Sequence, residues 1–179
     1  MGVLSAIAHC VVRKVEHLLA ARQIRARIKM TERHKAALEE ELNRLIELDP
    51  DMRRKFRILT SIPHIGPVTA MILIADLNEL GQVNCKQIAA LAGVAPMSWD
   101  SSAKEGVRII RSGRQTVRNA LYMCAIGLTR RKVGFGAHFR RLVDLGKHPK
   151  VAITAVMRKL VILANTLIAE DRCWSPTRP

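Results

Sequence analysis

The chain has 179 residues, of which 30 are Lys or Arg and 15 are Asp or Glu, so its formal net charge is +15. Hydrophobic residues make up 49% of it, enough for a packed core, which excludes disorder as the main state. Aromatic residues make up only 3%, which argues against a β-sandwich or barrel and against a stacking platform for single strands. These values predict a mostly α-helical, strongly basic domain.

The positive charge predicts a polyanionic partner. DNA or RNA is the first expectation, and an anionic membrane surface is the alternative. Arg outnumbers Lys by 20 to 10, which favours phosphate because a guanidinium group matches two phosphate oxygens. Residues 100–179 hold 16 basic and 5 acidic side chains, whereas residues 61–99 hold 1 and 2. We therefore expect the polyanion contact mainly in the last part of the chain.

The cysteines and the apolar runs favour a cytoplasmic protein. The cysteines are far apart and form no CxxC pair, which favours buried thiols in a reducing compartment over disulfides or zinc. The apolar start has no basic residues before it, so no signal peptide is predicted. The longest apolar run, Val151 to Ala169, is split by Arg158 and Lys159, so we expect no membrane span and no membrane partner. The four cysteines are Cys10, Cys85, Cys124 and Cys173.

Residues 1–48 are predicted to form a helical arm. Apolar residues recur there at alternating steps of three and four, a spacing typical of coiled coils, and Thr31 and Lys35 are polar members of the same seam. Two readings stay open: a dimerisation arm, and a surface helix that packs on its own domain. Asp49 and Pro50 are expected to end this helix and start the next one. The apolar members of the seam are Ile24, Ile28, Leu38, Leu42 and Leu45.

Residues 49–170 are predicted to form a compact helical domain. Pro67 opens a helix that Gly81 closes, and because apolar residues surround that helix it is expected at the centre of the core. A further helix is expected to start at Asn84, with Gln87 completing a capping box, and to end at Gly93.

The stretch 94–113 is predicted to be a long irregular loop, with Val107 to Ile110 as a candidate hairpin strand. Ser112 is expected to cap the helix that follows, with Gln115 in the capping-box position, and this helix runs towards Lys132. A last helix is predicted from Pro149 to Glu170. Residues 171–179 are expected to fray.

Two groups of residues are candidates for phosphate binding. The turn that contains Gly66 and Thr69 feeds a helix N-terminus, where free backbone N–H groups bind phosphate, as in a helix-hairpin-helix element. The alternative is an ordinary corner between helices. The second group combines a lysine and four arginines near a helix start, and its alternative is a solvated basic face. That group is Lys104, Arg108, Arg111, Arg114 and Arg118.

Ser101 and Ser102 follow Asp100 in the irregular loop. A serine hydroxyl is a nucleophile only when it is activated, and no Ser–His–Asp spacing can be identified in the sequence. On the residues alone, a role in a turn or cap is therefore the favoured reading of both serines.

Three blocks of the sequence together resemble one transposase family. In order and spacing they are similar to the carboxyl-terminal half of the transposases named for insertion sequences one-ten, one-sixteen and nine-oh-two. The resemblance covers Leu38 to Asn165, and a weaker similarity extends into the preceding arm. The blocks are IPHIGPVTA, LAGVAPMSWDSSAKEGVRIIRSGRQTVRNALYMCA and KVAITAVMRKLVILAN.

The resemblance implies a serine-type DNA transposase. In this family a RuvC-like domain with metal-binding acids is paired with the serine-bearing domain. Ser101 takes the position of the family's serine, which would attack a DNA phosphodiester and hold the strand as a phosphoserine. Arg111, Arg114 and Arg118 fall on the family's arginine segment and would steady the phosphate. Some members are guided by a structured RNA, so a guide RNA is a second expected partner.

Departures from the family pattern shape the remaining expectations. His64 stands where the family has glycine, and Ser102 replaces the glycine after the serine, which makes Ser102 a rival nucleophile. The RuvC-like half is missing, so we expect a truncated or split transposase that binds no metal itself, with magnesium held by the missing domain. Such a chain is expected to be inactive alone. The alternative functions are a non-catalytic nucleic-acid-binding module and a dimerising inhibitor of a full-length transposase.

Overall fold

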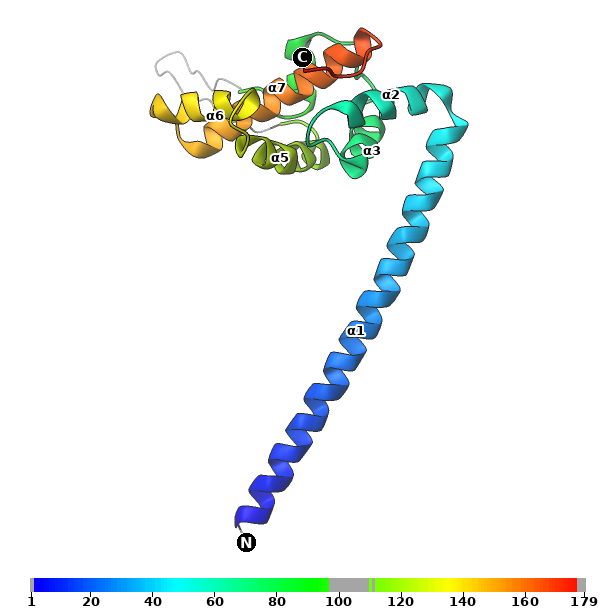
Figure 1. The fold of residues 1–179 in the computed structure, drawn as a ribbon, viewed down its shortest axis with the longest axis vertical. Coiled ribbons are helices and arrows are strands. Elements are labelled where there is room, and N and C mark those ends of the chain that lie inside the picture. Colours follow the sequence, from blue (N-terminus) through cyan, green and yellow to red (C-terminus); the bar gives the residue numbers. More distant parts are fainter. Residues whose placement is uncertain (1, 97–109, 111, 177–179) are drawn as a thin grey trace. The chain divides into compact units, whose positions relative to one another are not determined.

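A computed structural model describes residues 2–96, 110 and 112–176, with side chains from residue 17 onward. The described residues form helices and no strand ladder, which confirms the predicted, mostly α-helical class. The chain divides into two units, Met1–Asp49 and Pro50–Pro179. The helices, all but α4 labelled in Figure 1, are α1 (Gly2–Leu48), α2 (Pro50–Ser61), α3 (Pro67–Asp76), α4 (Cys85–Leu91), α5 (Gln115–Thr129), α6 (Phe135–Asp144) and α7 (Pro149–Ala169).

The first unit is the single helix α1. Its apolar seam is exposed along its length, from Ile24 at 56% to Leu38 at 66% and Leu45 at 48%. Two ion pairs on α1 join residues one turn apart, Lys35 with Glu39 at 3.6 Å and Arg44 with Glu41 at 3.3 Å. The helix ends at Leu48 and α2 begins at Pro50, as the Asp49–Pro50 pair predicts.

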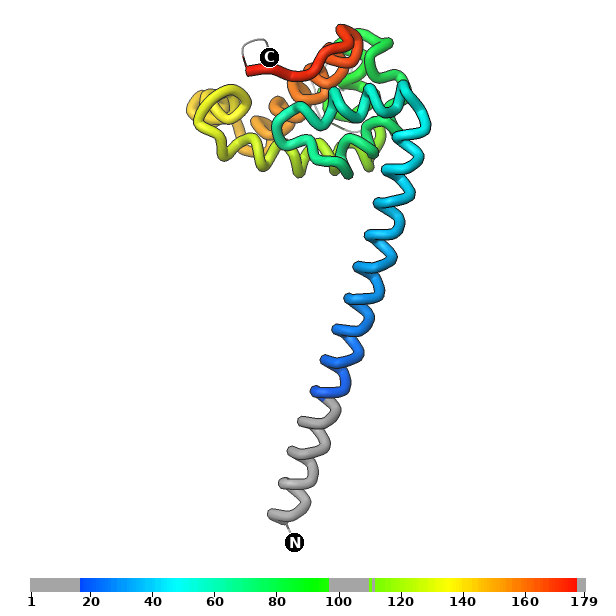
Figure 2. Tube along the Cα trace, turned by 45° about the vertical axis from the view of Figure 1, so that its right-hand side comes forward, coloured from blue at the N-terminus to red at the C-terminus, as the bar shows by residue number. Residues whose placement is uncertain are grey.

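The second unit, which we call the helical domain, is built around α7. This helix packs against α2, α4, α5 and α6 (Figure 2), and its inward face buries residues such as Val156, Leu160 and Leu167. By length and composition α7 could also cross a membrane, contrary to the expectation from the sequence, but half of its apolar window is buried inside the domain. That burial is typical of the core helix of a soluble protein.

The expectation that the helix after Pro67 is central is wrong. That helix, α3, contacts only α2 and α5, buries only Ala70 and Leu73, and leaves Val68 56% exposed. It also ends at Asp76, well before Gly81. The apolar composition of α3 on all sides therefore showed that this helix packs near the core, but not that it lies at the centre of the core.

The predicted start of α4 is correct, whereas the predicted start of α5 is not. The capping box at α4 is confirmed, because Asn84 accepts from the backbone of Gln87 and the Gln87 side chain accepts from Asn84. The capping box predicted for Ser112 and Gln115 is wrong. Helix α5 begins at Gln115, its N-cap residue is Arg114, and no side chain makes a capping hydrogen bond there. Gly113 has φ 89, which turns the backbone away from the helix one residue before Arg114.

Helix α6 was not predicted. Two glycines in the left-handed region bound it, Gly134 with φ 61 before it and Gly146 with φ 77 after it. The backbone N–H groups of Gly146 and Lys147 donate to Val143 and Leu142, which closes the last turn. The apolar spacing of Phe135, Phe139 and Leu142 is the sequence signal for this helix.

The segment after α7 folds back onto the helical domain. The backbone N–H of Trp174 donates to the Ser61 hydroxyl at 2.8 Å, and the Trp174 side chain packs against the core. The expectation of fraying is therefore wrong for residues 171–176. Cys124 is buried, as predicted, whereas Cys85 and Cys173 are exposed, which corrects the prediction of buried thiols for those two.

Candidate nucleic-acid interface

The stretch predicted to be an irregular loop contains most of the residues that the sequence indicates as candidates. Ser101, Ser102, Lys104, Arg108 and Arg111 all lie outside the described residues. The structure describes the two ends of this loop, up to Pro96 and again at Ile110 and from Ser112.

The base of the loop is a close contact between two glycines. Gly93 has φ 68 and Gly113 has φ 89, both in the left-handed region. A Cβ on Gly113 would lie 2.2 Å from the Gly93 nitrogen, and a Cβ on Gly93 would lie 2.2 Å from the Ser112 oxygen. The Arg114 N–H donates to the Leu91 carbonyl at 3.0 Å across the same junction. Only glycine fits at these two positions, so the two ends of the loop are held together by backbone atoms.

Arg114 is paired with a carboxylate of its own domain. Its guanidinium group donates two hydrogen bonds to Glu79, each 2.7 Å long. These bonds lower the pKa of Glu79 to about 2. Asp76 beside them accepts from the Thr116 hydroxyl, so both acids hold the start of α5. The charge of Arg114 is therefore largely matched inside the domain.

Arg118 is also bound within the protein. Its Nη1 donates to the Ser112 carbonyl at 2.9 Å, and its Nη2 donates to the Gln115 side chain. Arg118 therefore holds the returning end of the loop against α5. A contact of Arg114 or Arg118 with DNA stays a prediction.

The turn before α3 keeps a free helix N-terminus. Gly66 is the N-cap residue, φ is −86 there, and no side chain caps the helix among the described residues. A Cβ on Gly66 would meet nothing within 4 Å, so the turn is open to solvent at this point. The Thr69 hydroxyl lies 3.5 Å from Cys124 Sγ and points towards α5. A phosphate at this turn would therefore meet the backbone of Thr69 and not its hydroxyl, and the roles of Gly66 and Thr69 stay predictions.

A second basic group was missed by the sequence analysis. Residues 130–159 contain nine Lys or Arg residues and one acid, Asp144. None of the nine is ion-paired to a carboxylate within the described part of the chain, and all are exposed except Arg158, which is half-buried. We call them the basic surface: Arg130, Arg131, Lys132, Arg140, Arg141, Lys147, Lys150, Arg158 and Lys159.

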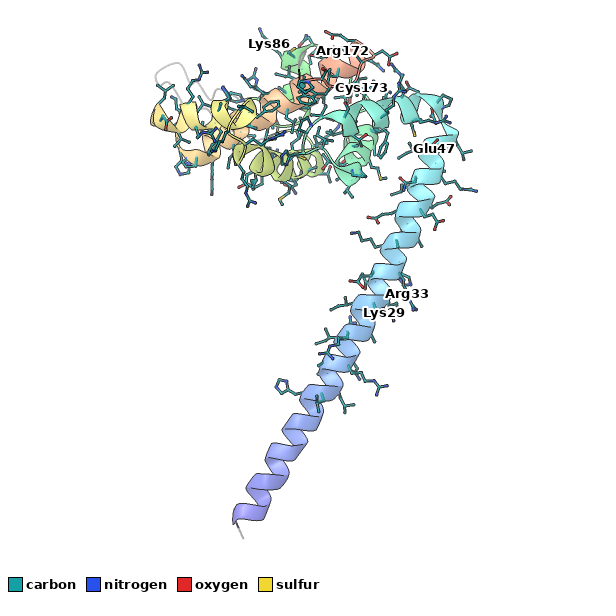
Figure 3. All side chains as sticks on the ribbon, in the orientation of Figure 1. Lys29, Arg33, Glu47, Lys86, Arg172 and Cys173 are labelled. Carbon is teal, nitrogen blue, oxygen red and sulfur yellow. The ribbon has the colours of Figure 1, made fainter. Side chains whose placement is uncertain are left out.

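The helices that carry or border the basic surface, α5, α6 and α7, pack against one another. Lys159 and Arg141 both lower the pKa of His138, after the larger effect of its burial, which places these charges around one ring. By contrast, Lys86 of α4 and Lys29 and Arg33 of α1 project from other parts of the chain (Figure 3). The sequence signal for the basic surface is the excess of Lys and Arg over acids in residues 130–159, a segment that lies outside the predicted loop.

The basic surface reaches the base of the irregular loop. A hollow of about 480 Å³ is lined by Pro96 and Ile110, the residues at the two described ends of the loop, and by the first half of α7. Lys150 and Arg158 supply its cationic lining. The loop therefore leaves the helical domain directly beside two cations of the basic surface.

The described residues offer no site that fits a magnesium ion. They contain no group of three or more His, Cys, Asp or Glu side chains close enough to share a metal. Asp76 and Glu79, the nearest acids to the loop base, are engaged by Thr116 and Arg114.

Comparison with known proteins finds one family that the helical domain resembles. Residues 56–140 match the model of the Transposase IS116/IS110/IS902 family. This part of the chain is therefore similar to the transposases of that family. The matched segment runs from α2 into α6 and includes the Gly66 turn, both loop ends and Arg118, whereas Lys150 and Arg158 follow it.

The chain is also similar to two proteins that have a name. These are the pilin gene-inverting proteins of Moraxella bovis and Moraxella lacunata, each 30% identical to it over 139 residues. The match covers 75% of this chain and 43% of each relative, so the chain spans less than half of their length.

Proposed function

We propose that this chain binds DNA as part of a transposase or recombinase and that Ser101 is the nucleophile that cuts the strand. The observation that supports this most is the hollow in which both ends of the serine-bearing loop meet Lys150 and Arg158. A phosphate held by these two cations would lie beside the loop. Positioning of this kind is what makes a weak nucleophile such as a serine hydroxyl useful.

In the proposed step the Ser101 oxygen attacks the phosphorus of a DNA phosphodiester. A Ser–O–P bond forms, the bond to one deoxyribose oxygen breaks, and that oxygen takes up a proton as it leaves. The serine proton must pass to a base, which we expect from the RuvC-like domain of the family. The negative charge that develops on the phosphate would be stabilised by Lys150 and Arg158.

Two other functions are alternatives to this one. A non-catalytic nucleic-acid-binding module would keep the cations without using the serine, and a dimerising inhibitor of a full-length transposase would act through α1. A guide RNA is a further proposed partner, because A-form RNA presents phosphates to the same kind of surface. The two experiments below separate these functions.

The first experiment measures binding of duplex DNA as salt is raised. If about six phosphates are neutralised, affinity falls roughly a thousandfold between about 50 and 200 mM salt. Removing two phosphate contacts with the pair Lys150→Gln and Arg158→Gln lowers the salt slope by about two. The matched control pair is Arg57→Gln and Lys86→Gln, which removes one Arg and one Lys from exposed positions elsewhere in the helical domain. Equal effects of the two pairs contradict the assignment of the surface, and a flat salt response contradicts DNA binding.

The second experiment traps the covalent protein–DNA adduct. The chain is supplied with an acidic RuvC-like domain and magnesium, and adduct is detected on a denaturing gel. Ser101→Ala abolishes the adduct while DNA affinity stays nearly unchanged, whereas Ser102→Gly keeps or raises the yield. If Ser102→Ala alone abolishes the adduct, Ser102 is the nucleophile. If neither serine matters, the binding-module function replaces the catalytic one.

A further inference from the structure

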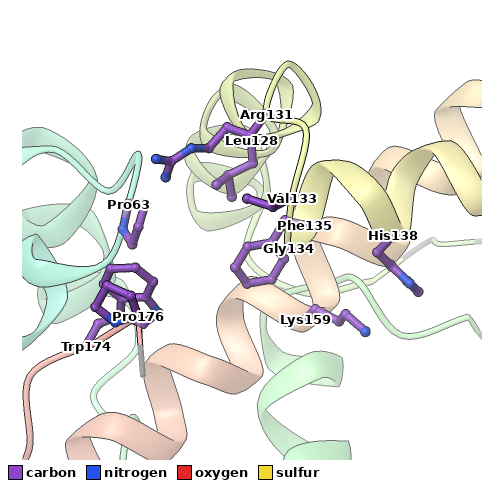
Figure 4. Close-up of a pocket in the computed structure, with 10 residues that line it drawn as sticks. All are labelled: Pro63, Leu128, Arg131, Val133, Gly134, Phe135, His138, Lys159, Trp174 and Pro176. Carbon is purple, nitrogen blue, oxygen red and sulfur yellow. The ribbon is translucent and has the colours of Figure 1, made fainter. Parts of the chain in front are cut away.

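A second cavity lies between α5, α6 and the C-terminal segment. Its volume is about 600 Å³, within the range of sites for small molecules. One wall comes from Trp174 and Pro176 of the C-terminal segment with Pro63, and the opposite wall from Phe135 of α6 with Leu128 of α5. Figure 4 shows Trp174 and Phe135 on opposite sides of this space, with the Arg131 side chain above them.

Both aromatic walls are fixed by the fold. The Trp174 backbone is hydrogen-bonded to the Ser61 hydroxyl at 2.8 Å, and both aromatic side chains are partly buried against the core. Gly136 lets α6 start against the end of α5, because a Cβ there would lie 1.8 Å from the Arg131 carbonyl oxygen. The cavity is therefore formed before any ligand binds.

The lining selects a flat, apolar group that carries a negative charge nearby. The chain has only six aromatic residues, and two of them face this one cavity. The charged or titratable side chains in the lining are Arg131, Lys159 and His138, and no carboxylate lines the cavity among the residues that the structure describes. A cationic ligand or a basic peptide would find no partner there. An aromatic heterocycle attached to a phosphate matches both the walls and the rim.

We infer that this cavity binds one unpaired nucleobase of the nucleic acid whose phosphates lie on the basic surface. Arg131 and Lys159 belong to both the cavity and the basic surface, so a strand on that surface passes the opening of the cavity. Burial, with smaller effects of Lys159 and Arg141, lowers the pKa of His138. An uncharged imidazole can both donate to and accept from the edge of a base. The inference rests on the proposed binding of nucleic acid and adds a site for a base to it.

The test compares duplexes with a single-nucleotide bulge. One duplex carries an adenine in the bulge, the second carries an abasic residue with the same phosphate, and the third has no bulge. Stacking on aromatic side chains is worth between about fivefold and 150-fold in affinity for each base. The wild-type chain is expected to prefer the adenine bulge over the abasic bulge by a factor in that range. Bulges made of DNA and of RNA distinguish the source of the base.

Two leucine variants test whether the preference for the adenine bulge arises in this cavity. Phe135→Leu and Trp174→Leu keep the walls apolar but remove the stacking faces, so each brings the adenine-to-abasic ratio close to one and leaves affinity for the unbulged duplex unchanged. The matched control is Phe139→Leu, which removes an aromatic ring one turn along α6 that does not line the cavity. A loss of the ratio in the control as well would overturn the assignment to this cavity.

A further measurement needs no variant. A bulged 2-aminopurine changes its fluorescence when it stacks on an aromatic side chain, so addition of the wild-type chain is expected to quench it. No quenching and a ratio of one, together with normal binding of the unbulged duplex, overturn the base site and leave the proposed function intact. Absence of binding to all three duplexes overturns the proposed function itself.

Discussion

His64 holds the turn before α3 in a conformation that suits glycine. Its φ is 68, in the left-handed region, where a Cβ costs about 1–2 kcal/mol. The His64 ring also fills the space beside α5, because a Cβ on Gly127 would lie 2.5 Å from His64 Nδ1. Position 64, where the family resemblance leads us to expect glycine, is occupied by His64, and its ring lies against Gly127.

This contact predicts that the two positions are coupled. His64→Gly is expected to raise the free energy of unfolding by about 0.5–1 kcal/mol, since relief of the backbone strain exceeds the added entropy of the unfolded chain. Gly127→Ala is nearly neutral alone, because its gain of about 1 kcal/mol in helix propensity is offset by displacement of the His64 ring. In the His64→Gly background the same change yields the full gain. Urea unfolding of the two single variants and the double variant measures this, and simple additivity contradicts it.

At the scale of elements, α1 and the helical domain use their apolar residues differently. In the helical domain α7 buries its apolar face against four helices, whereas the seam of α1 is exposed in the structure. Surface ion pairs such as Lys35 with Glu39 contribute little to stability. An isolated helix of this length gains more from burial of an apolar seam against a second helix.

We therefore predict that α1 dimerises through its seam. Replacing Leu38 and Leu42 with Asp adds two charges to the seam and is expected to convert a dimer to a monomer, measured by sedimentation or light scattering. The melting of the helical domain should not change. The control pair, Ala36→Asp and Asn43→Asp, adds the same charges off the seam and should leave the mass unaltered. An unchanged mass in the seam variant would mean that the arm does not form the dimer contact.

At the scale of the whole molecule, the link between Glu79 and Arg114 makes stability depend on pH. It joins the segment after α3 to the start of α5, near the base of the loop. The pKa of Glu79 falls from 4.5 to about 2 because Arg114 stabilises the charged carboxylate. The unfolded chain therefore binds more protons than the folded chain in that interval, so the stabilisation is present above about pH 4.5 and is lost as the pH falls towards about 2.

The expected result is a pH-dependent difference between wild type and Glu79→Gln. The variant should unfold more easily at neutral pH, and its deficit should shrink to nothing as the pH approaches about 2. Urea unfolding followed across this range measures the difference. Glu39→Gln, which removes a carboxylate from α1, serves as the control and should show no such convergence. A deficit that stays constant with pH would show that the carboxylate charge of Glu79 is not what stabilises the fold.

Features governed by neighbouring residues were predictable from the sequence. The Asn84 capping box, the break at Pro50 and the span of α7 each depend on residues within a few positions of one another, and all three are found. The low aromatic content and the surplus of charge in the last part of the chain likewise follow from composition. The family resemblance rested on the order of short blocks, and the match over residues 56–140 confirms it.

Features governed by distant residues were decided only by the tertiary structure. Arg114 looks like a free cation in the sequence, but it pairs with Glu79, which lies 35 positions away, because the path of the chain brings the two together. The same path sets Trp174 opposite Phe135 and the ends of the loop beside Lys150 and Arg158. The sequence by itself indicated most of the helices, with α6 as the exception, and how much charge the chain carries. Which charges remain unpaired, and where the aromatic rings meet, depended on long-range packing, because no local rule says which helix a side chain will face.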